Sequence, residues 1–144
     1  MVTYVDSLTG VRADQLTGFF VDWPNPPSPE THLRILEASS FIELAIDDHL
    51  DRVVGFVYAI SDGILSAYIP LLEVLPSHLG QGIGSELMRR MLDRLSHLYM
   101  IDLLCDPEVQ SFYDRLGMQR AQGMLIRNYT RQSGRAESGT EGKP

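Results

Sequence analysis

The sequence predicts one mixed α/β domain, in which a run of antiparallel strands leads into a strand, a glycine-rich loop and a helix. Residues 41–74 hold three β-prone segments separated by short turns, the pattern of consecutive antiparallel strands. Residues 71–98 then join an apolar run, three closely spaced glycines and a stretch with apolar residues every three or four positions, as on one helix face. A length of 144 residues suits one core. We therefore expect a single domain over residues 1–130.

Before residue 41 the pattern predicts a short strand at 3–5 and helices at 14–20 and 29–38. The second helix has a strong start signal, because Ser28 can cap it and the proline that follows is tolerated at the first helical position. Between the helices, three prolines indicate a stiff loop. This loop carries Trp23, the only tryptophan, which either lines an acceptor pocket or fills the edge of the core.

The rest of the chain is expected to alternate between strand and helix. Ser61-Asp62-Gly63 is typical of a hairpin turn, and Asp106-Pro107-Glu108 is typical of a helix start. The expected strands are 41–46, 53–60, 64–74, 99–105 and 123–129, and the expected helices are 83–98 and 106–117. Residues 131–144 are rich in glycine, serine and charge, show no periodicity and are expected to be disordered.

Composition excludes several classes of protein. The net charge of −7 opposes nucleic-acid binding, because contacts to phosphates need a basic surface, but it is compatible with a cationic acceptor. No apolar run approaches the length that spans a bilayer, and the N-terminus lacks a signal-peptide pattern. Cys105 is the only cysteine and the four histidines show no ligand spacing, so we expect no disulfide, no metal and a cytoplasmic location.

The segment Gly80-Gln81-Gly82-Ile83-Gly84-Ser85 predicts an anion site. The first N–H groups of a helix have no partner within the helix, and the helix dipole adds positive potential there. Glycines let a phosphate approach this backbone without meeting a Cβ atom. An ordinary tight turn would not need three glycines, and a nucleoside-triphosphate loop would need a lysine that is absent.

A dinucleotide-binding fingerprint is the other alternative. The glycine spacing nearly fits it, and Asp102 or Asp106 lies at about the right distance for the acid that binds the ribose. However, Pro76-Ser77-His78-Leu79 separate the apolar run from the first glycine, and the motif follows a series of strands in the middle of the chain. This position leaves no room for a doubly wound domain.

The segment LEVLPSHLGQGIGSEL resembles motif A of the GNAT superfamily of acyl-CoA-dependent N-acyltransferases, in which R/Q-x-x-G-x-G/A follows a strand that ends in V-x-P. Leu79 stands at the Arg/Gln position, which removes one side-chain contact to phosphate and leaves the backbone N–H groups. Residues 106–118 resemble a second GNAT landmark, N-x-x-A-x-x-x-Y-x-x-x-G-F, with Asp106 at the Asn position, Tyr113 at the Tyr and Gly117 at the Gly. The two landmarks occur in the correct order and at the correct spacing.

The resemblance implies a central, mostly antiparallel twisted sheet of six to seven strands with helices on both faces. It implies acetyl-CoA as co-substrate and direct attack of a primary amine on the thioester in a ternary complex. The pantetheine arm would enter between the strands that end at Val74 and at Cys105. The residues implied in binding acetyl-CoA are Leu72, Glu73, Val74, Leu79, Gly80, Gln81, Gly82, Ile83, Gly84, Ser85, Asp106 and Tyr113.

Tyr113 corresponds to the general acid that protonates the departing thiolate in this family; without the resemblance it would be read as a packed aromatic residue. The sequence does not single out one residue as the general base. Strand alternation places Tyr68, Pro70 and Leu72 on the cleft face and turns Glu73 away unless a bulge intervenes. A water relay to Glu43 or Glu30 is an equal alternative. Cys105 is read as a structural thiol rather than a nucleophile.

The expected partners are a small-molecule or peptidic amine and neither nucleic acid nor membrane. The family commonly dimerises, so the resemblance allows a homodimer. A non-catalytic acyl-CoA-binding or regulatory module is the rival to an enzyme, because no strand glutamate is clearly placed as a base.

Overall fold

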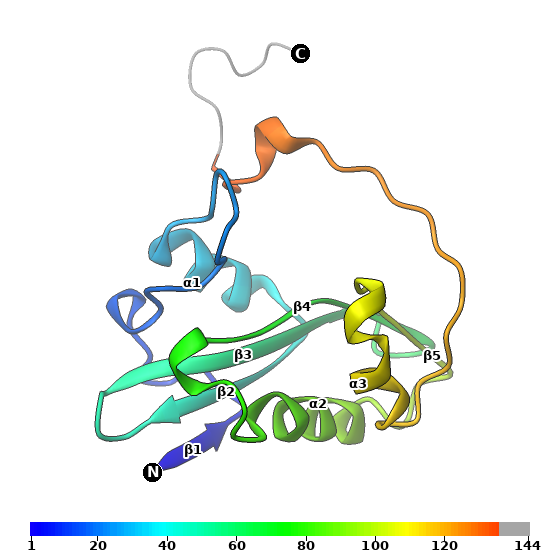
Figure 1. Cartoon of the computed structure of the whole chain (residues 1–144), viewed down its shortest axis with the longest axis horizontal. Coiled ribbons are helices and arrows are strands. Elements are labelled where there is room, and N and C mark those ends of the chain that lie inside the picture. Colours follow the sequence, from blue (N-terminus) through cyan, green and yellow to red (C-terminus); the bar gives the residue numbers. More distant parts are fainter. Residues whose placement is uncertain (136–144) are drawn as a thin grey trace.

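One five-stranded sheet, with strand order β1-β2-β3-β4-β5, forms the centre of the computed structural model, which describes residues 1–135 (Figure 1). The first four strands pair antiparallel, and β5 runs parallel to β4. The strands are β1 (Val2–Val5), β2 (Phe41–Asp47), β3 (Arg52–Ser61), β4 (Ser66–Val74) and β5 (Met100–Asp102). The sheet is therefore mixed and mostly antiparallel, as the sequence predicts.

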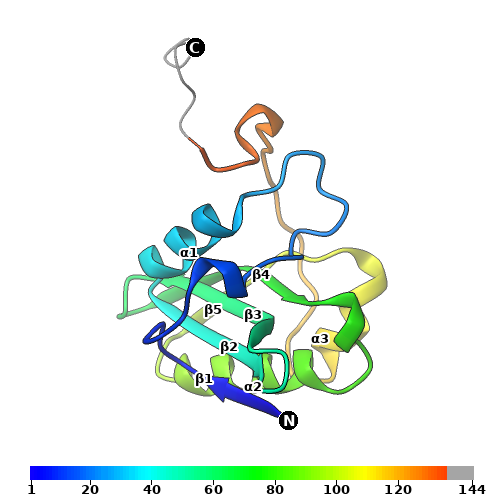
Figure 2. The same cartoon turned by 90° about the vertical axis from the view of Figure 1, so that its left-hand side faces the viewer.

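Helices cover both faces of this sheet. Figure 2 shows α1 (Pro29–Ala38) above the strands and α2 (Ile83–Arg94) below them. The short helix α3 (Gln110–Asp114) lies beyond β5 in the sequence and packs near the start of α2. The remaining helical turns are η1 (Ala13–Gln15), η2 (Pro76–His78), η3 (Pro107–Val109) and η4 (Tyr129–Arg131). The start of α1 is the predicted one, because Ser28 Oγ accepts a hydrogen bond from Thr31 N at 3.1 Å.

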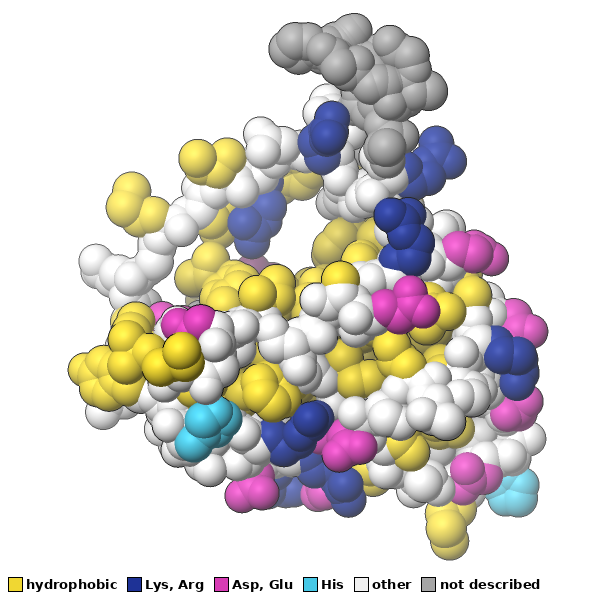
Figure 3. Space-filling model, turned by 180° about the vertical axis from the view of Figure 1, so that it is seen from behind, with side chains coloured by type: hydrophobic (Ala, Val, Ile, Leu, Met, Phe, Trp, Pro, Cys, Tyr) yellow, Lys and Arg dark blue, Asp and Glu magenta, His cyan; other side chains and the backbone are white. Residues whose placement is uncertain are grey.

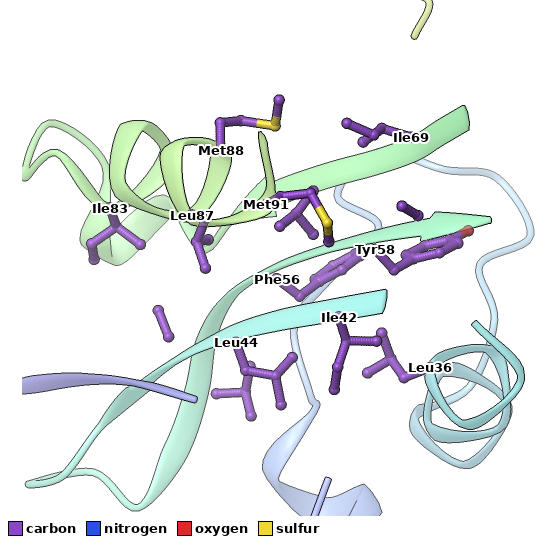
Figure 4. Packing of buried hydrophobic residues seen from close by; sticks show 14 of the residues in the cluster. Leu36, Ile42, Leu44, Phe56, Tyr58, Ile69, Ile83, Leu87, Met88 and Met91 are labelled. Atoms are coloured by element: carbon purple, nitrogen blue, oxygen red, sulfur yellow. The ribbon is translucent and has the colours of Figure 1, made fainter. Parts of the chain in front are cut away.

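The core has one layer on each side of β3 (Figure 4). On the α2 side, Leu87 and Ile83 approach the backbone of Gly55 so closely that a Cβ atom there would lie 3.0 and 3.1 Å from them. On the α1 side, the rings of Phe19 and His32 pack against Phe56, with centroid distances of 5.0 and 4.4 Å. Phe56 is fully buried and joins the sheet to the helical layer.

A β-bulge divides β4 into two parts. Tyr68 pairs with Ile60 and Leu71 pairs with Tyr58, so two residues of β4 lie opposite the single residue Ala59 of β3. The bulge shifts the alternation of side chains by one residue. Tyr68 and Glu73 therefore share one face of the sheet, although they are separated by an odd number of positions.

Several sequence predictions are corrected by the structure. The predicted helix 14–20 is only the single turn η1, because Gly18 and Phe20 have φ values of 91° and 64°, which a right-handed helix cannot contain. The predicted strand 123–129 is not a strand, and 99–105 is shortened to β5. The sheet thus has five strands rather than six to seven.

Within residues 1–135, no helix is both long and apolar enough to cross a membrane. Of the segment predicted to be disordered, residues 131–135 include the end of η4 and a turn at Gly134, and residues 136–144 lie outside the described part of the chain.

Candidate functional site

The glycine loop joins the end of β4 to the start of α2. β4 leaves the sheet where Leu75 N donates to Val54 O at 2.8 Å, and the turn η2 follows. Gly80 and Gly82 have φ values of 79° and 80°, a left-handed conformation that residues with a Cβ atom rarely adopt. A Cβ atom at either position would meet nothing within 4 Å. The loop therefore needs glycine for its backbone shape, and the space in front of it is open.

The N-terminus of α2 has no side-chain cap. Gly82 is the N-cap residue, and no side chain of the described residues accepts a hydrogen bond from the first turn. The helix is twelve residues long, so its dipole adds to the positive potential of these N–H groups. Leu79 is 64% exposed and lies on the approach to the loop. This arrangement is suited to binding a phosphate through backbone atoms alone.

β4 and β5 part after a short stretch of pairing. Their register runs from Ser66↔Met100 to Tyr68↔Asp102, and β5 ends there. Within residues 1–135, the second half of β4, which contains Leu72 and Val74, has no neighbouring strand on its β5 side. Backbone groups along this edge are thus available to a ligand that enters between the strands. The resemblance described above implies this separation, and the structure places it directly before the glycine loop.

Glu73 uses its carboxylate to hold another segment of the chain. Its Oε1 and Oε2 atoms accept hydrogen bonds from Phe20 N at 2.9 and 3.0 Å, and Oε2 accepts one from Val21 N at 3.2 Å. The bulge in β4 turns Glu73 to the face of Tyr68 and Leu72 to the opposite face, so the predicted sharing of one face by Tyr68 and Leu72 is wrong. The Glu73 side chain anchors the loop that precedes α1.

Tyr113 lies at a cavity of about 370 Å³ between β5, α3 and the segment 118–124. Burial raises the pKa of Tyr113 to about 12, with a smaller contribution from Cys105. The neutral phenol therefore persists at every physiological pH and can donate a hydrogen bond to a developing anion. Next to it, the ring of Phe112 would lie 3.7 Å from a Cβ atom at Gly84. α3 thus connects the start of α2 to the cavity.

Other cavity residues were assigned no role from the sequence, although strand alternation placed Tyr68 on the cleft face. Tyr68, Asp102 and Cys105 line the cavity, and so does Asp114. Asp114 is held by Arg120 at 2.7 Å, which leaves Asp102 as the lining carboxylate with no ion pair among the described residues. Burial raises the pKa of the Cys105 thiol, which agrees with its interpretation as a structural residue rather than a nucleophile. Only the register of β4 and β5, which pairs Tyr68 with Asp102, could have indicated that these residues lie close together.

Asp106 does not line this cavity. It is exposed and is the N-cap residue of η3, where its side chain makes no capping hydrogen bond, although Val109 N donates to its carbonyl oxygen at 3.1 Å. Gln81 is exposed in the loop, Ser85 lies in the first turn of α2, and Ile83 is buried beneath that turn. The structure therefore groups the loop residues with β4 and brings α3 to them through Phe112, whereas Tyr113 faces the cavity.

A pair of polar residues supports the glycine loop from behind. His78, which is buried in η2, donates through Nε2 to Asp47 Oδ2 at 2.8 Å, and its Nδ1 is hydrogen-bonded to Ser77 Oγ at 2.7 Å. The contact to His78 lowers the pKa of Asp47. The sequence carries no signal for this pair, since the partners are 31 residues apart and meet only through the position of β2.

Glu43 and Glu30, the two alternatives for the general base, lie elsewhere. Glu43 is 2% exposed and binds Arg94 at 3.1 Å, at the C-terminal end of α2. Burial raises the pKa of Glu43, an effect that Arg94 partly opposes. The glycine loop lies at the other end of this helix, about 18 Å away at 1.5 Å per residue. Glu30 is exposed in the first turn of α1.

The Trp23 side chain packs against the core. Its ring lies 4.9 Å from that of Phe20, and it is only partly exposed. The loop therefore closes the edge of the core, as one of the two interpretations of Trp23 expects. The mostly antiparallel sheet also removes the dinucleotide alternative for the glycine loop, which requires a doubly wound parallel sheet.

Comparisons with known proteins agree with this geometry. The model of the acetyltransferase (GNAT) family matches residues 8–118. A proposed acetyltransferase from Deinococcus radiodurans R1 has 51% sequence identity and a TM-score of 0.89 over 92% of both chains. A GNAT family protein from Streptococcus pneumoniae TIGR4 has 31% identity and a TM-score of 0.70 over 89% of this chain and 98% of that one.

Curated relatives are longer than the matched region. The uncharacterized N-acetyltransferase ycf52 of Porphyra purpurea is 31% identical over 100 residues, which cover 67% of this chain and 58% of the relative. The match thus spans somewhat more than half of that relative's length.

Proposed function

Because the chain belongs to the GNAT family of acetyltransferases, we propose that it transfers an acetyl group from acetyl-CoA to a primary amine. The observation that carries this proposal is the uncapped N-terminus of α2, which opens through Gly80 and Gly82 beside the unpaired half of β4. An anion-binding loop next to a free strand edge suits a ligand that has a pyrophosphate at one end and amide groups along its arm.

Each part of the site has a task in this reaction. The N–H groups at the start of α2 bind the pyrophosphate, and the free edge of β4 around Leu72 and Val74 orients the pantetheine amides. Acetyl-CoA supplies the activated acetyl group as a thioester. The nitrogen of the neutral amine forms a bond to the carbonyl carbon, and the carbon–sulfur bond breaks. Tyr113 donates a hydrogen bond to the sulfur as negative charge develops on it.

Asp102 is suited to receiving the amine. It lines the cavity beside Tyr113, and no arginine of the described residues neutralises it. A carboxylate in this position attracts an ammonium group and can accept the proton that the amine must lose, directly or through one water molecule. Glu73 is not assigned this role, because its carboxylate holds Phe20 and Val21.

The experiment that tests the function has two parts. Thermal unfolding with acetyl-CoA, CoA or NADH measures which ligand stabilises the protein; at 100 times its dissociation constant, a ligand adds about 2.7 kcal/mol. Mass spectrometry then measures the acetylated products from a panel of small and peptidic amines. We expect both CoA species to stabilise the protein, NADH to have no effect, and at least one amine to be acetylated.

A non-catalytic acyl-CoA-binding module is the second candidate, because Tyr113 is the only side chain that the family motif assigns to the chemistry. Binding of CoA with no acetylation of any amine would favour that candidate. Stabilisation by NADH alone would contradict both. Asp102→Asn tests the proposed amine site: we expect a fall of at least tenfold in kcat/KM for the amine and an unchanged dissociation constant for acetyl-CoA.

A further inference from the structure

A second hollow, of about 490 Å³, lies between the end of β1 and the C-terminal half of α2. It shares no lining residue with the cavity beside Tyr113, and the glycine loop lies at the other end of α2. Figure 3 shows basic and acidic side chains side by side along its lower edge, where α2 lies. We call this hollow the charged hollow; its charged lining residues are Asp6, Glu43, Arg90, Asp93 and Arg94.

Glu43 is the most buried of these residues. It belongs to β2, its side chain is 3% exposed, and its Oε2 atom accepts a hydrogen bond from Arg94 Nη1 at 3.1 Å. The other carboxylate oxygen, Oε1, accepts no hydrogen bond from any group in residues 1–135. A buried carboxylate oxygen without a donor is costly, because nothing replaces the water that it binds in the unfolded chain. A ligand with an N–H donor would remove this cost.

Two more carboxylates of the charged hollow lack a partner. Asp6 and Asp93 are exposed, and neither side chain forms an ion pair or a hydrogen bond within residues 1–135. Burial is the main reason why the pKa of Glu43 is raised; Arg94 opposes this effect, and the nearby charge of Asp6 adds to it. Three carboxylates face two guanidinium groups here, so the hollow attracts a positive group.

The two arginines of the charged hollow keep donors free. Arg90 is fixed in place, because its Nε donates to Glu86 Oε2 at 2.8 Å and its guanidinium lies 4.7 Å from the centre of the Tyr4 ring. Arg94 uses only Nη1 in its hydrogen bonds. Both Nη atoms of Arg90 and the Nη2 atom of Arg94 donate to no group in residues 1–135. Such donors are suited to a carboxylate, which they can bind with two parallel hydrogen bonds.

We propose that the charged hollow binds a free α-amino acid in its zwitterionic form. The ammonium group of the ligand donates to Glu43 Oε1 and faces Asp6, and its carboxylate accepts hydrogen bonds from Arg90. This ligand satisfies the free acceptors and the free donors together, whereas a ligand with one charge satisfies only one of the two sets. A volume of about 490 Å³ lies in the range of small-molecule sites, so the hollow also has room for the side chain of the ligand.

The location of the charged hollow distinguishes this ligand from an acceptor amine. An acceptor must reach the cavity that Asp102 and Tyr113 line, whereas the charged hollow is formed by β1, β2 and the last turns of α2. The amino acid and acetyl-CoA therefore bind to opposite halves of α2, and neither blocks the other.

Two-dimensional NMR of the full chain, labelled with ¹⁵N, tests the proposal with the common free amino acids as probes. We expect at least one of them to shift the amide signals of residues 4–7 and 90–94, with or without saturating CoA. The amide of this amino acid lacks the carboxylate and its N-acetyl derivative lacks the ammonium group, so each should bind about tenfold more weakly or worse.

Three outcomes of this experiment would overturn the proposal. The first is that no amino acid shifts these signals. The second is that the shifts are confined to residues 101–124, because the amino acid would then bind only in the cavity beside Tyr113. The third is that either derivative binds as tightly as its parent. Failure of CoA to bind would contradict the proposed function and would leave the shifts at residues 4–7 and 90–94 as evidence for the charged hollow.

Substitutions test the same contacts through the dissociation constant of the amino acid. We expect Glu43→Gln to weaken binding about tenfold and Asp6→Asn about threefold. Asp6 is exposed, so its substitution leaves the fold intact and decides the question if Glu43→Gln does not fold. Glu37→Gln is the matched control for Asp6→Asn, because Glu37 is an exposed acid of α1 on the other face of the sheet. Equal effects of Asp6→Asn and Glu37→Gln would overturn the proposal, since only the overall charge would then matter.

Discussion

His78 Nε2 donates a hydrogen bond to Asp47 Oδ2 over 2.8 Å and so ties the turn before the glycine loop to the end of β2. The side chains of both residues are largely buried, with 10% and 15% exposed. We expect His78→Phe, which fills the same space without the hydrogen bond, to lower the Tm and to weaken acetyl-CoA binding. Calorimetric titration measures the binding. An unchanged dissociation constant together with a lower Tm would mean that the pair stabilises the fold but does not position the loop.

The same pair predicts a dependence on pH. The contact to His78 lowers the pKa of Asp47 in the folded protein, so its stabilising contribution is present above the ordinary carboxyl pKa and is lost as the pH falls through the lowered value. We expect Asp47→Asn to reduce the loss of Tm between pH 5 and pH 3, relative to wild type. An identical decrease in Tm between pH 5 and pH 3 in both proteins would contradict this expectation.

His32 predicts a second acid-sensitive step. It is fully buried among Phe19, Phe20 and Phe56, its ring nitrogens have no hydrogen-bond partner in residues 1–135, and burial lowers its pKa to about 4. The unfolded chain takes up this proton near pH 6.5 and the folded chain does not. Stability therefore falls from pH 6.5 towards pH 4, by roughly 3 kcal/mol. We expect His32→Leu to remove this loss and to stabilise the protein at pH 5, measured by urea unfolding.

Gly82→Ala tests whether the shape of the glycine loop matters for binding. Its φ of 80° makes any Cβ atom costly, by about 1–2 kcal/mol, and the loop must distort or strain. Gly63→Ala is the matched control, because Gly63 has a φ of 76° and equally open space but lies in the β3–β4 turn. We expect both variants to lose similar stability and only Gly82→Ala to lose affinity for acetyl-CoA. Equal affinities would contradict the assignment of the loop.

Tyr113→Phe tests the proton donor. We expect kcat to fall about 100-fold with little change in KM for acetyl-CoA, because the hydroxyl acts only on the departing sulfur. With its pKa raised to about 12, the wild-type phenol stays neutral, so the rate should show no alkaline limb from Tyr113 below pH 10. Steady-state rates at several pH values measure both effects. A change of less than threefold in kcat would show that Tyr113 is a packing residue.

Two substitutions of Glu73 distinguish an anchoring role from a catalytic one. Glu73→Ala leaves Phe20 N and Val21 N without their acceptor and should cost about 2 kcal/mol, with faster proteolysis in residues 20–28. Glu73→Gln keeps an amide oxygen that can accept one of these hydrogen bonds, so we expect most of the stability and most of the turnover rate to remain. If Glu73→Gln instead slowed turnover about 100-fold without a loss of stability, Glu73 would be identified as the general base.

Local patterns predicted the centre of this molecule well. The strands β2, β3 and β4, the cap at Ser28 and the helix after Gly82 all depend on neighbouring residues, which the sequence shows directly. The glycine loop could be predicted for the same reason. The proposal that it binds an anion rests on the open helix terminus, which is a local property.

The predictions from sequence were wrong where contacts between residues far apart in the sequence determine the local structure. The helix expected at 14–20 has the apolar residues for one, but Phe20 N binds Glu73 instead, and its φ of 64° ends any helix. The alternation along β4 failed at a bulge that only pairing with Ala59 reveals. The segment 123–129 has the composition of a strand but pairs with no strand among residues 1–135, and strand pairing depends on distant residues that a local pattern does not show.

The bulge in β4 also constrains how this protein can change over time. Ile69 and Pro70 both lie opposite Ala59, so deletion of either residue would remove the bulge and leave Leu71 opposite Tyr58, with Glu73 still on the face that reaches Phe20. Insertion of one more residue would instead shift the alternation and turn Glu73 away from Phe20 unless the bulge grew larger. In related sequences, this short stretch should therefore tolerate exchanges of residue type and the loss of one residue, whereas insertions should gather at the β2–β3 and β3–β4 turns.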